Sequence, residues 1–177
     1  MQLPSDPAAD AAPGAPSFLP PGCAVRRAQA ADAGRVLALS AAAFLPVYLP
    51  VIGVAPRPAT EDYAPHIALG ETWLATLDGL DAGALVLHPG VDAWTLYSIA
   101  VHPDAQGRGL GRALLAFAQA RTRAAGAQTL RLYTNVRMTR NVALYRGAGF
   151  VEVGTRPHPR YAGEFLVDMA WRTATAQ

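Results

Sequence analysis

The sequence predicts an α/β fold in which a mixed β-sheet is covered by helices. Strand-length segments rich in Val, Leu, Trp and Tyr alternate along the chain with segments whose apolar residues recur every three to four positions. The clearest unit runs from a strand at residues 94–101, through a helix at 109–125, to a strand at 129–135. Such a unit joins parallel strands by a right-handed connection. No internal repeat is present, which excludes a solenoid or a propeller.

Length and composition indicate one domain with a short tail. The chain has 177 residues, enough to bury a large core without a disulfide or a metal. Hydrophobic residues make up 51% and charged residues 16%, which excludes a wholly disordered chain. The single cysteine, Cys23, excludes an intramolecular disulfide framework and a cysteine-rich zinc site. Because we find neither a bilayer-length apolar run nor a secretory leader, we expect a cytoplasmic protein.

Residues 1–22 are predicted to form a disordered tail, because they are rich in Ala, Pro, Asp and Gly and offer little to bury. The domain is expected to occupy residues 23–177. It begins with a short strand at 24–28 and an alanine-rich helix at 31–44. The residues available for the buried side of that helix are Val36, Leu37, Leu39 and Phe44.

Residues 45–58 contain four prolines. Because proline lacks the amide N–H and clashes with the preceding turn, we expect no long regular helix in this segment. The segment is nevertheless strongly apolar, which is unusual for a surface loop. Thr60 follows it and is suited to cap a short helix that contains Glu61, Asp62 and Tyr63.

Three strands are expected next, at residues 72–77, 83–87 and 94–101. The first of them alternates between apolar and polar residues and is followed by Asp78-Gly79, a hairpin turn signal. His88 and His102 each precede a proline, so we interpret both as turn residues.

The C-terminal half is predicted to hold two helices and three strands. The helix at 109–125 is the most periodic in the chain and ends at Gly126. The other elements are a strand at 129–135, a helix at 139–148, and strands at 150–153 and 165–171. The complete order is therefore β-α-α-β-β-β-α-β-α-β-β.

The charges are distributed unevenly along the chain. All 15 basic residues are arginines, and the net charge is +2. Residues 101–160 contain ten arginines against two acidic residues, whereas residues 1–100 contain four arginines against nine. A basic half favours an anionic partner, such as a phosphate-rich ligand or a nucleic acid. The alternative is that these arginines cover solvated helix faces.

A glycine-rich loop at residues 101–112, with the sequence VHPDAQGRGLGR, is the strongest local signal. It connects a strand to the start of a helix. Glycine lets the backbone approach a ligand and adopt positive φ angles, and the first amides of a helix have no internal partner. With Arg108 and Arg112 beside them, these amides are predicted to bind a phosphate group.

Two common phosphate-binding patterns do not fit this loop. The P-loop pattern needs a lysine, and the chain has none. The dinucleotide pattern G-x-G-x-x-G fits Gly107 and Gly109 but meets Arg112 at its last glycine. A plain strand-to-helix connection would need only two glycines, whereas this loop has three in alternation. Phosphate binding is therefore the favoured interpretation.

Two segments resemble the GNAT acetyltransferase superfamily. The pattern Gln106-x-x-Gly109-x-Gly111, after a strand, resembles the acetyl-CoA loop of that family. Residues 141–150, NVALYRGAGF, resemble its helix that carries an asparagine and a tyrosine and closes in Gly-Phe. The two segments lie one helix and one strand apart, as they do in the family. With the order of the elements, the resemblance covers nearly all of the chain except the tail.

The resemblance implies an α/β (α+β) fold with a mixed, mostly antiparallel twisted sheet of about six to seven strands and about four helices. The sheet would splay open between the strands at 94–101 and 129–135, and acetyl-CoA would bind in the opening as co-substrate, without a metal. Its pantetheine arm would pair with the first of these strands, and its pyrophosphate would lie on the loop amides. The residues implied for the cofactor are Ile99, Ala100, Val101, Gln106, Gly107, Arg108, Gly109, Leu110, Gly111, Arg112, Asn141 and Tyr145.

Acetyl transfer to an amine needs a base, a donor for the developing oxyanion and an acid for the leaving thiolate. Asn141 and Tyr145 share a helix face, which the resemblance places against the cofactor sulfur, so Tyr145 is the candidate general acid. The alternative is that Tyr145 is a core residue. The base is left open among Glu71, Tyr97, Glu152 and His158. Since no Ser-His-Asp or Cys-His arrangement can be argued, we expect direct transfer in a ternary complex.

The acceptor site is expected between the first helices, the apolar residues 45–54 and residues 155–163. Arg156 and Arg160 are suited to hold a carboxylate. Glu61, Asp62 and Glu71 would attract a cationic amine. The acceptor is left open among a small amine, an amino acid, an antibiotic-like compound and a peptide or protein amine. We expect a monomer or homodimer that contacts neither nucleic acid nor membrane.

Two other function classes compete with an N-acetyltransferase. One is a non-catalytic module that binds or senses an acyl-CoA on the same fold. The other is a nucleic-acid binder that uses the arginines. The second class lacks support, because we find no helix-turn-helix or aromatic-rich sheet motif and the arginines are spread over several elements.

Overall fold

The computed structural model describes residues 19–173 and confirms the predicted α/β class. Most of the predicted tail, residues 1–18, lies outside the described part. Seven strands form one sheet in the order β1-β2-β3-β4-β5-β7-β6. The strands are β1 (Cys23–Arg27), β2 (Thr72–Leu77), β3 (Leu80–His88), β4 (Ala93–Val101), β5 (Thr129–Asn135), β6 (Val151–Pro157) and β7 (Phe165–Arg172).

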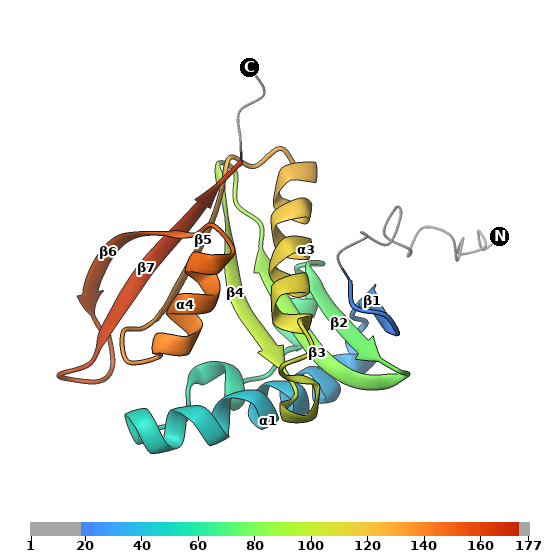
Figure 1. The fold of residues 1–177 in the computed structure, drawn as a ribbon, viewed down its shortest axis with the longest axis horizontal. Helices are drawn as coiled ribbons and strands as arrows, with labels where there is room; N and C mark the ends of the chain where they lie inside the picture. The colour runs from blue at the N-terminus through green and yellow to red at the C-terminus, as the bar shows by residue number, and fades with distance from the viewer. Residues whose placement is uncertain (1–18, 174–177) are drawn as a thin grey trace.

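The sheet is antiparallel except between β4 and β5, and that junction is open over most of its length. Only three pairs of residues join the two strands, from Ala93↔Thr129 to Thr95↔Arg131. Beyond Thr95 the strands diverge, and Figure 1 shows the gap widening away from the end where they meet. The opening that the resemblance implied is therefore present, and we call it the seam.

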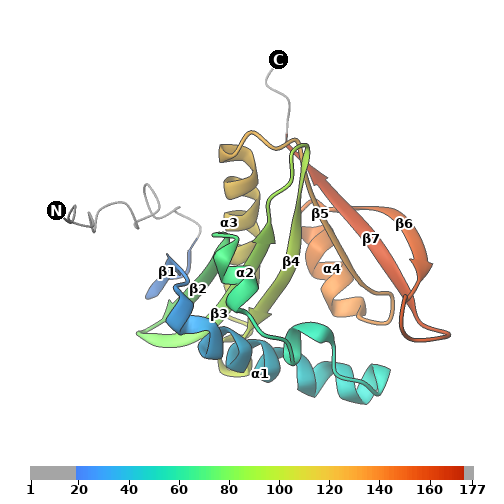
Figure 2. The same cartoon turned by 180° about the vertical axis from the view of Figure 1, so that it is seen from behind.

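The helices are α1 (Ala33–Ile52), α2 (Ala64–Ala68), α3 (Leu110–Ala124) and α4 (Thr139–Gly147). Helices α3 and α4 cover one face of the sheet, and α1 and α2 lie on the other, with α1 crossing the open end of the seam (Figures 1 and 2). Strand residues alternate between two cores, because successive side chains of a strand point to opposite faces. Trp73 packs on the α3 side, while its neighbour Leu74 packs with Val36 of α1.

Helix α1 overturns the prediction that the prolines of residues 45–58 prevent a long helix. It continues through Pro46 and Pro50 to Ile52, and Gly53 ends it with a φ angle of 84° and an amide that donates to Leu49 O. Each proline removes one helical hydrogen bond. The spacing of Phe44, Tyr48 and Ile52 places their side chains on one helix face, where they line the seam. The position of these three side chains at the seam favours a helix here despite the prolines.

The expected cap at Thr60 is also wrong. Residues Arg57–Ala59 form a 3₁₀ turn that ends at Thr60, and the short helix α2 starts later. The carboxylate of Asp62 accepts a hydrogen bond from the amide of Ala64 at 2.9 Å, so the acidic residue satisfies the start of this helix.

Residues Ala30–Ile52, with a mean hydropathy of 1.8, are long and apolar enough to cross a membrane by length and composition alone. The same segment buries Val36, Leu39 and Ala43, and 22% of its apolar window is buried within the structure. This apolar stretch is longer than the sequence analysis expected, because its prolines do not end the helix.

Candidate active site

Two adjoining cavities lie at the seam. The loop cavity has a volume of about 440 Å³, and the outer cavity has a volume of about 580 Å³. Both are lined by Phe44, Tyr48, Ile99, Asn141 and Tyr145. A molecule that bridges the two cavities must therefore pass between α1, β4 and α4.

The loop cavity is built on the glycine-rich loop and the start of α3. Gly109 is the residue before this helix, and its φ angle of 82° is one that other residues rarely adopt. No side chain caps the helix start. The first amides of α3 are therefore free to bind an anion, and the helix dipole favours a negative charge there. Gln106, Gly107, Leu110 and Gly111 also line this cavity.

The arginines that line the loop cavity differ in one respect from the pair predicted from the sequence. Arg112 lines the loop cavity, but Arg108 does not, because its guanidinium pairs with Asp78 at 3.0 Å. Arg140 lines the cavity in its place. Arg140 was not predicted to bind the ligand, although it directly precedes Asn141, the first residue of the second resembling segment, and could have been selected on that ground.

Strand β4 presents its free edge to the cavities. Ile99 and Val101 line the loop cavity, and Gln106 donates from its side-chain amide to Val101 O at 3.1 Å. Ala100 faces the opposite way, into the core under α1, so only its backbone is available on this side. Past Thr95 the edge has no strand partner among residues 19–173, which leaves β4 amides and carbonyls able to pair with an extended ligand.

Tyr145 lies where the two cavities meet. Its side chain is 7% exposed and packs edge-on against Phe150, with the ring centroids 6.1 Å apart. Asn141 lies one turn earlier on the same face of α4 and lines both cavities. Burial raises the pKa of the Tyr145 phenol well above its ordinary value of 10.0, so the hydroxyl keeps its proton at neutral pH.

Three of the four candidate bases lie in places that do not suit that role. Glu71 is outside both cavities, held by Arg27, Arg121 and the indole N–H of Trp73. Glu152 pairs with Arg146 on the surface. His158 lines the outer cavity, but its Nδ1 accepts hydrogen bonds from the amides of residues 160 and 161, so the ring holds the loop.

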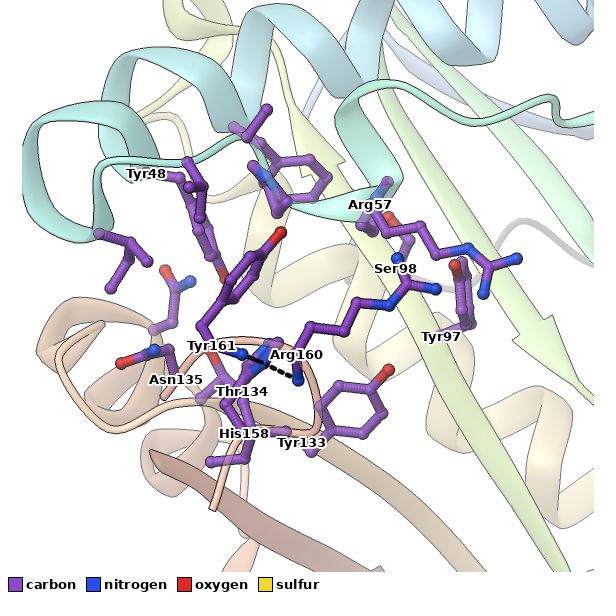
Figure 3. A pocket seen from close by; sticks show the side chains of 18 of the residues that line it. Tyr48, Arg57, Tyr97, Ser98, Tyr133, Thr134, Asn135, His158, Arg160 and Tyr161 are labelled. Carbon is purple, nitrogen blue, oxygen red and sulfur yellow. Dashed lines mark hydrogen bonds between the residues drawn. The ribbon is translucent and has the colours of Figure 1, made fainter. Parts of the chain in front are cut away.

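The fourth candidate, Tyr97, sits on a β-bulge. Val86 pairs with Ser98 and Leu87 pairs with Leu96, which leaves Tyr97 as the extra residue of β4. Its side chain lines the outer cavity, as Figure 3 shows. Its hydroxyl donates to Oε1 of Glu61 at 2.6 Å. Burial, followed by this hydrogen bond to Glu61, raises the pKa of Tyr97 well above its ordinary value.

Behind Tyr97 lies a cluster that we call the Glu61 cluster, formed by Glu61, His66 and His88. Nε2 of His66 lies 3.4 Å from Oε2 of Glu61, and Nδ1 of His66 lies 2.9 Å from Nε2 of His88. The Tyr97 ring lies 4.6 Å from each imidazole. His88 is therefore more than the turn residue that the sequence suggested. Its pKa is lowered, mainly by burial and then by the neighbouring His66, so the His88 ring is neutral at pH 7.

A family model described as an acetyltransferase (GNAT) domain matches residues 68–152, a range that includes the glycine loop and the whole of the second resembling segment. The mycothiol acetyltransferase of Cellulomonas flavigena is 43% identical over 84 residues, which are 46% of this chain and 23% of that protein. The mycothiol acetyltransferase of a Nocardioides species is 31% identical over 166 residues, which are 80% of this chain and 54% of that protein. The chain thus spans only part of the length of both relatives.

The fold is shared with solved structures. The PaiA N-acetyltransferase of Thermoplasma acidophilum, solved in complex with coenzyme A, matches with a TM-score of 0.69 at 15% identity, over 85% of this chain and 99% of that structure. This likeness concerns the fold alone. The match of residues 68–152 to the family model places this part of the chain in the GNAT acetyltransferase family.

Proposed function

We propose that the protein is an acetyl-CoA-dependent N-acetyltransferase that moves the acetyl group directly to a primary amine in a ternary complex. One observation carries the proposal: the unpaired edge of β4 leads from the uncapped start of α3 to the buried hydroxyl of Tyr145. An extended ligand with a phosphate at one end and a reactive group at the other fits this path. We further propose that it acts in the cytoplasm.

Acetyl-CoA would supply the acetyl group as a thioester. We assign its pyrophosphate to the amides of residues 107–112, with Arg112 and Arg140 adding charge, and its pantetheine arm to the edge of β4 at Ile99 and Val101. Arg108 would contribute through the loop backbone, because its side chain pairs with Asp78. The outer cavity would then receive the acceptor amine.

The amine must lose a proton before it can attack. An alkyl ammonium with a pKa near 10.4 costs roughly 4–5 kcal/mol to deprotonate at neutral pH. We assign the proton to Tyr97 and the Glu61 cluster. As the amine proton passes to the Tyr97 oxygen, the hydroxyl proton passes to Glu61 along the 2.6 Å hydrogen bond. Glu61 then holds the proton, and Nε2 of His66 lies 3.4 Å from the other oxygen of this carboxyl group.

The amine nitrogen then forms a bond to the thioester carbon, and a β4 amide stabilises the oxygen as it becomes negative. When the C–S bond breaks, Tyr145 donates its proton to the sulfur, and the second proton that the nitrogen must lose to become an amide restores the Tyr145 phenol. A free thiol has a pKa near 8.5, below that of the phenol, so this transfer is uphill in water. The apolar surroundings that raise the pKa of Tyr145 also disfavour a free thiolate, so a thiolate formed there is stabilised by taking up a proton.

Calorimetric titration with acetyl-CoA, followed by an assay of CoA release with a panel of primary amines, tests the proposed function. Micromolar binding of acetyl-CoA, without comparable binding of NAD, together with amine-dependent CoA release is the expected result. Binding without release for any amine would favour the non-catalytic acyl-CoA-binding module instead. Folded protein that binds no acetyl-CoA would overturn both functions.

Replacing Tyr97 by phenylalanine tests the assignment of the base. The ring and its stacking on the two imidazoles remain, but the link to Glu61 is lost, so kcat should fall about 10²-fold. The acidic limb of the pH profile should also move upward, toward the pKa of the free amine, because the amine must then lose its proton to water. Tyr133→Phe removes another hydroxyl from the outer cavity and should have a smaller effect. An unchanged rate and pH profile for Tyr97→Phe would rule out this route.

A further inference from the structure

The outer cavity has an unusual charge composition. Three arginines line it, Arg57, Arg156 and Arg160, and no aspartate or glutamate is among its lining residues in the described part of the chain. A site for an acceptor with additional positive charges, such as a polyamine, would be expected to present carboxylates. This cavity presents positive charge instead, which disfavours such an acceptor and favours one that carries a negative charge.

Two of the three arginines pair with carboxylates that do not line the cavity. Nε of Arg156 lies 2.9 Å from Asp168, and the guanidinium also stacks on the Tyr133 ring at 5.1 Å. Nε of Arg57 lies 2.8 Å from Glu61. Within residues 19–173 the Arg160 guanidinium has no carboxylate within 4.0 Å. The cavity therefore carries one uncompensated positive charge.

The Arg160 side chain points into the cavity. Figure 3 shows it extended across the opening toward Ser98, beside Arg57. Its backbone is held in place, because the amides of Arg160 and Tyr161 both donate to Nδ1 of His158, at 3.1 and 3.2 Å. The amide of His158 in turn donates to Glu164 O at 2.8 Å. The turn that carries Arg160 is thus closed by its own hydrogen bonds.

Much of the rest of the wall is aromatic. Tyr97, Tyr133 and Tyr161 lie around Arg160 (Figure 3), and Phe44, Tyr48 and Tyr145 also line the cavity. Rings of this kind bury flat or apolar bodies and leave their hydroxyls to polar groups. A volume of about 580 Å³ suits a small molecule.

We propose that the acceptor is an amino acid with an apolar or aromatic side chain, whose carboxylate binds the Arg160 guanidinium while its amine points toward Tyr97 and Tyr145. This inference rests on the proposed function and names its acceptor class. A guanidinium binds a carboxylate through two parallel hydrogen bonds. One uncompensated charge matches a carboxylate better than a phosphate monoester, which carries about 1.5 to 2 negative charges at neutral pH. The arginine also fixes which end of the acceptor faces the thioester.

The test compares matched acceptors. Four amino acids are assayed: phenylalanine, tyrosine, tryptophan and leucine. Each is compared with its corresponding amine, in which a hydrogen replaces the carboxyl group. We expect kcat/KM to be at least about tenfold higher for one or more of the amino acids than for its amine, since a charge-assisted hydrogen bond contributes about 1.5–3 kcal/mol. Arg160→Met should remove that preference by lowering kcat/KM for the amino acid alone, and Arg160→Lys should restore part of it.

Arg123→Met is the matched control, because Arg123 stacks on Trp171 and lines neither cavity, so the preference should survive. Calorimetric binding of the same amino acids to the CoA-loaded protein gives a readout without turnover. If the amines match or exceed all four amino acids, or if no member of any pair binds or reacts, the acceptor class is wrong. Transfer to amines without a carboxylate preference would leave the proposed function intact. Absence of acetyl-CoA binding would instead overturn the proposed function itself.

Discussion

Replacing Tyr145 by phenylalanine is expected to lower kcat about 10²-fold or more while leaving the affinity for acetyl-CoA nearly unchanged. The substitution keeps the ring that packs against Phe150 and removes only the hydroxyl at the junction of the two cavities. The leaving thiolate then has no proton donor beside it. Single-turnover measurement of CoA release, with calorimetry for cofactor binding, checks both parts of this result.

The pH dependence of the Tyr145 variant adds a second test. Because the pKa of Tyr145 is raised above its ordinary value of 10.0, the phenol is protonated throughout the neutral and mildly alkaline range. The loss in Tyr145→Phe should therefore be the same at about pH 7 and about pH 9. Tyr48→Phe removes a different hydroxyl from the same two cavities and should cost less. Equal turnover in Tyr145→Phe and the unaltered protein would make Tyr145 a packing residue.

Replacing Gly109 by valine is expected to raise the Kd for acetyl-CoA by more than about 10²-fold, because two or more charge-assisted hydrogen bonds to the pyrophosphate would be lost. The added side chain would occupy open space beside the loop, since no atom lies within 4 Å of the Cβ position. The positive φ angle adds a backbone cost of about 1–2 kcal/mol. Calorimetric titration with acetyl-CoA measures the change in affinity.

Gly126→Val separates these two effects. Gly126 follows the other end of α3, has a φ angle of 74° and likewise has no atom within 4 Å of its Cβ position, but it lines neither cavity. Its variant should show a similar loss of thermal stability with normal binding of acetyl-CoA. If both variants bind the cofactor as tightly as the unaltered protein, the assignment of the loop to the pyrophosphate is wrong.

Local patterns predicted most of the fold. The strands at 72–77 and 129–135 have the predicted bounds, and α3 differs by one residue at each end, because alternation, turn residues and helical periodicity act over short distances. The path of α1 was missed because proline argues locally against a helix, whereas the packing of α1 against β3 and β4, which are distant in the sequence, favours it.

The candidate site was likewise predictable where its residues are close in the sequence, and not where they meet only in the folded chain. The loop from Gln106 to Arg112 is contiguous in sequence, so its residues could be selected together. The Glu61 cluster could not, because His66 and His88 belong to different elements and meet only after the sheet has formed. The pairing of Arg108 with Asp78, which takes its side chain out of the cavity, also depends on residues 30 positions apart. Charge and spacing alone do not reveal such partners.

The seam has a consequence for how new acceptor preferences can arise. Within the sheet, the strands on the side of Arg156 and Arg160 pair with the strands on the side of the glycine loop through only three residue pairs, at one end of β4 and β5. A substitution near that junction can change the angle between the two parts without altering the loop. The width of the outer cavity can therefore vary while the phosphate-binding amides stay in place. Evolution can in this way exchange one acceptor for another and keep the acetyl donor.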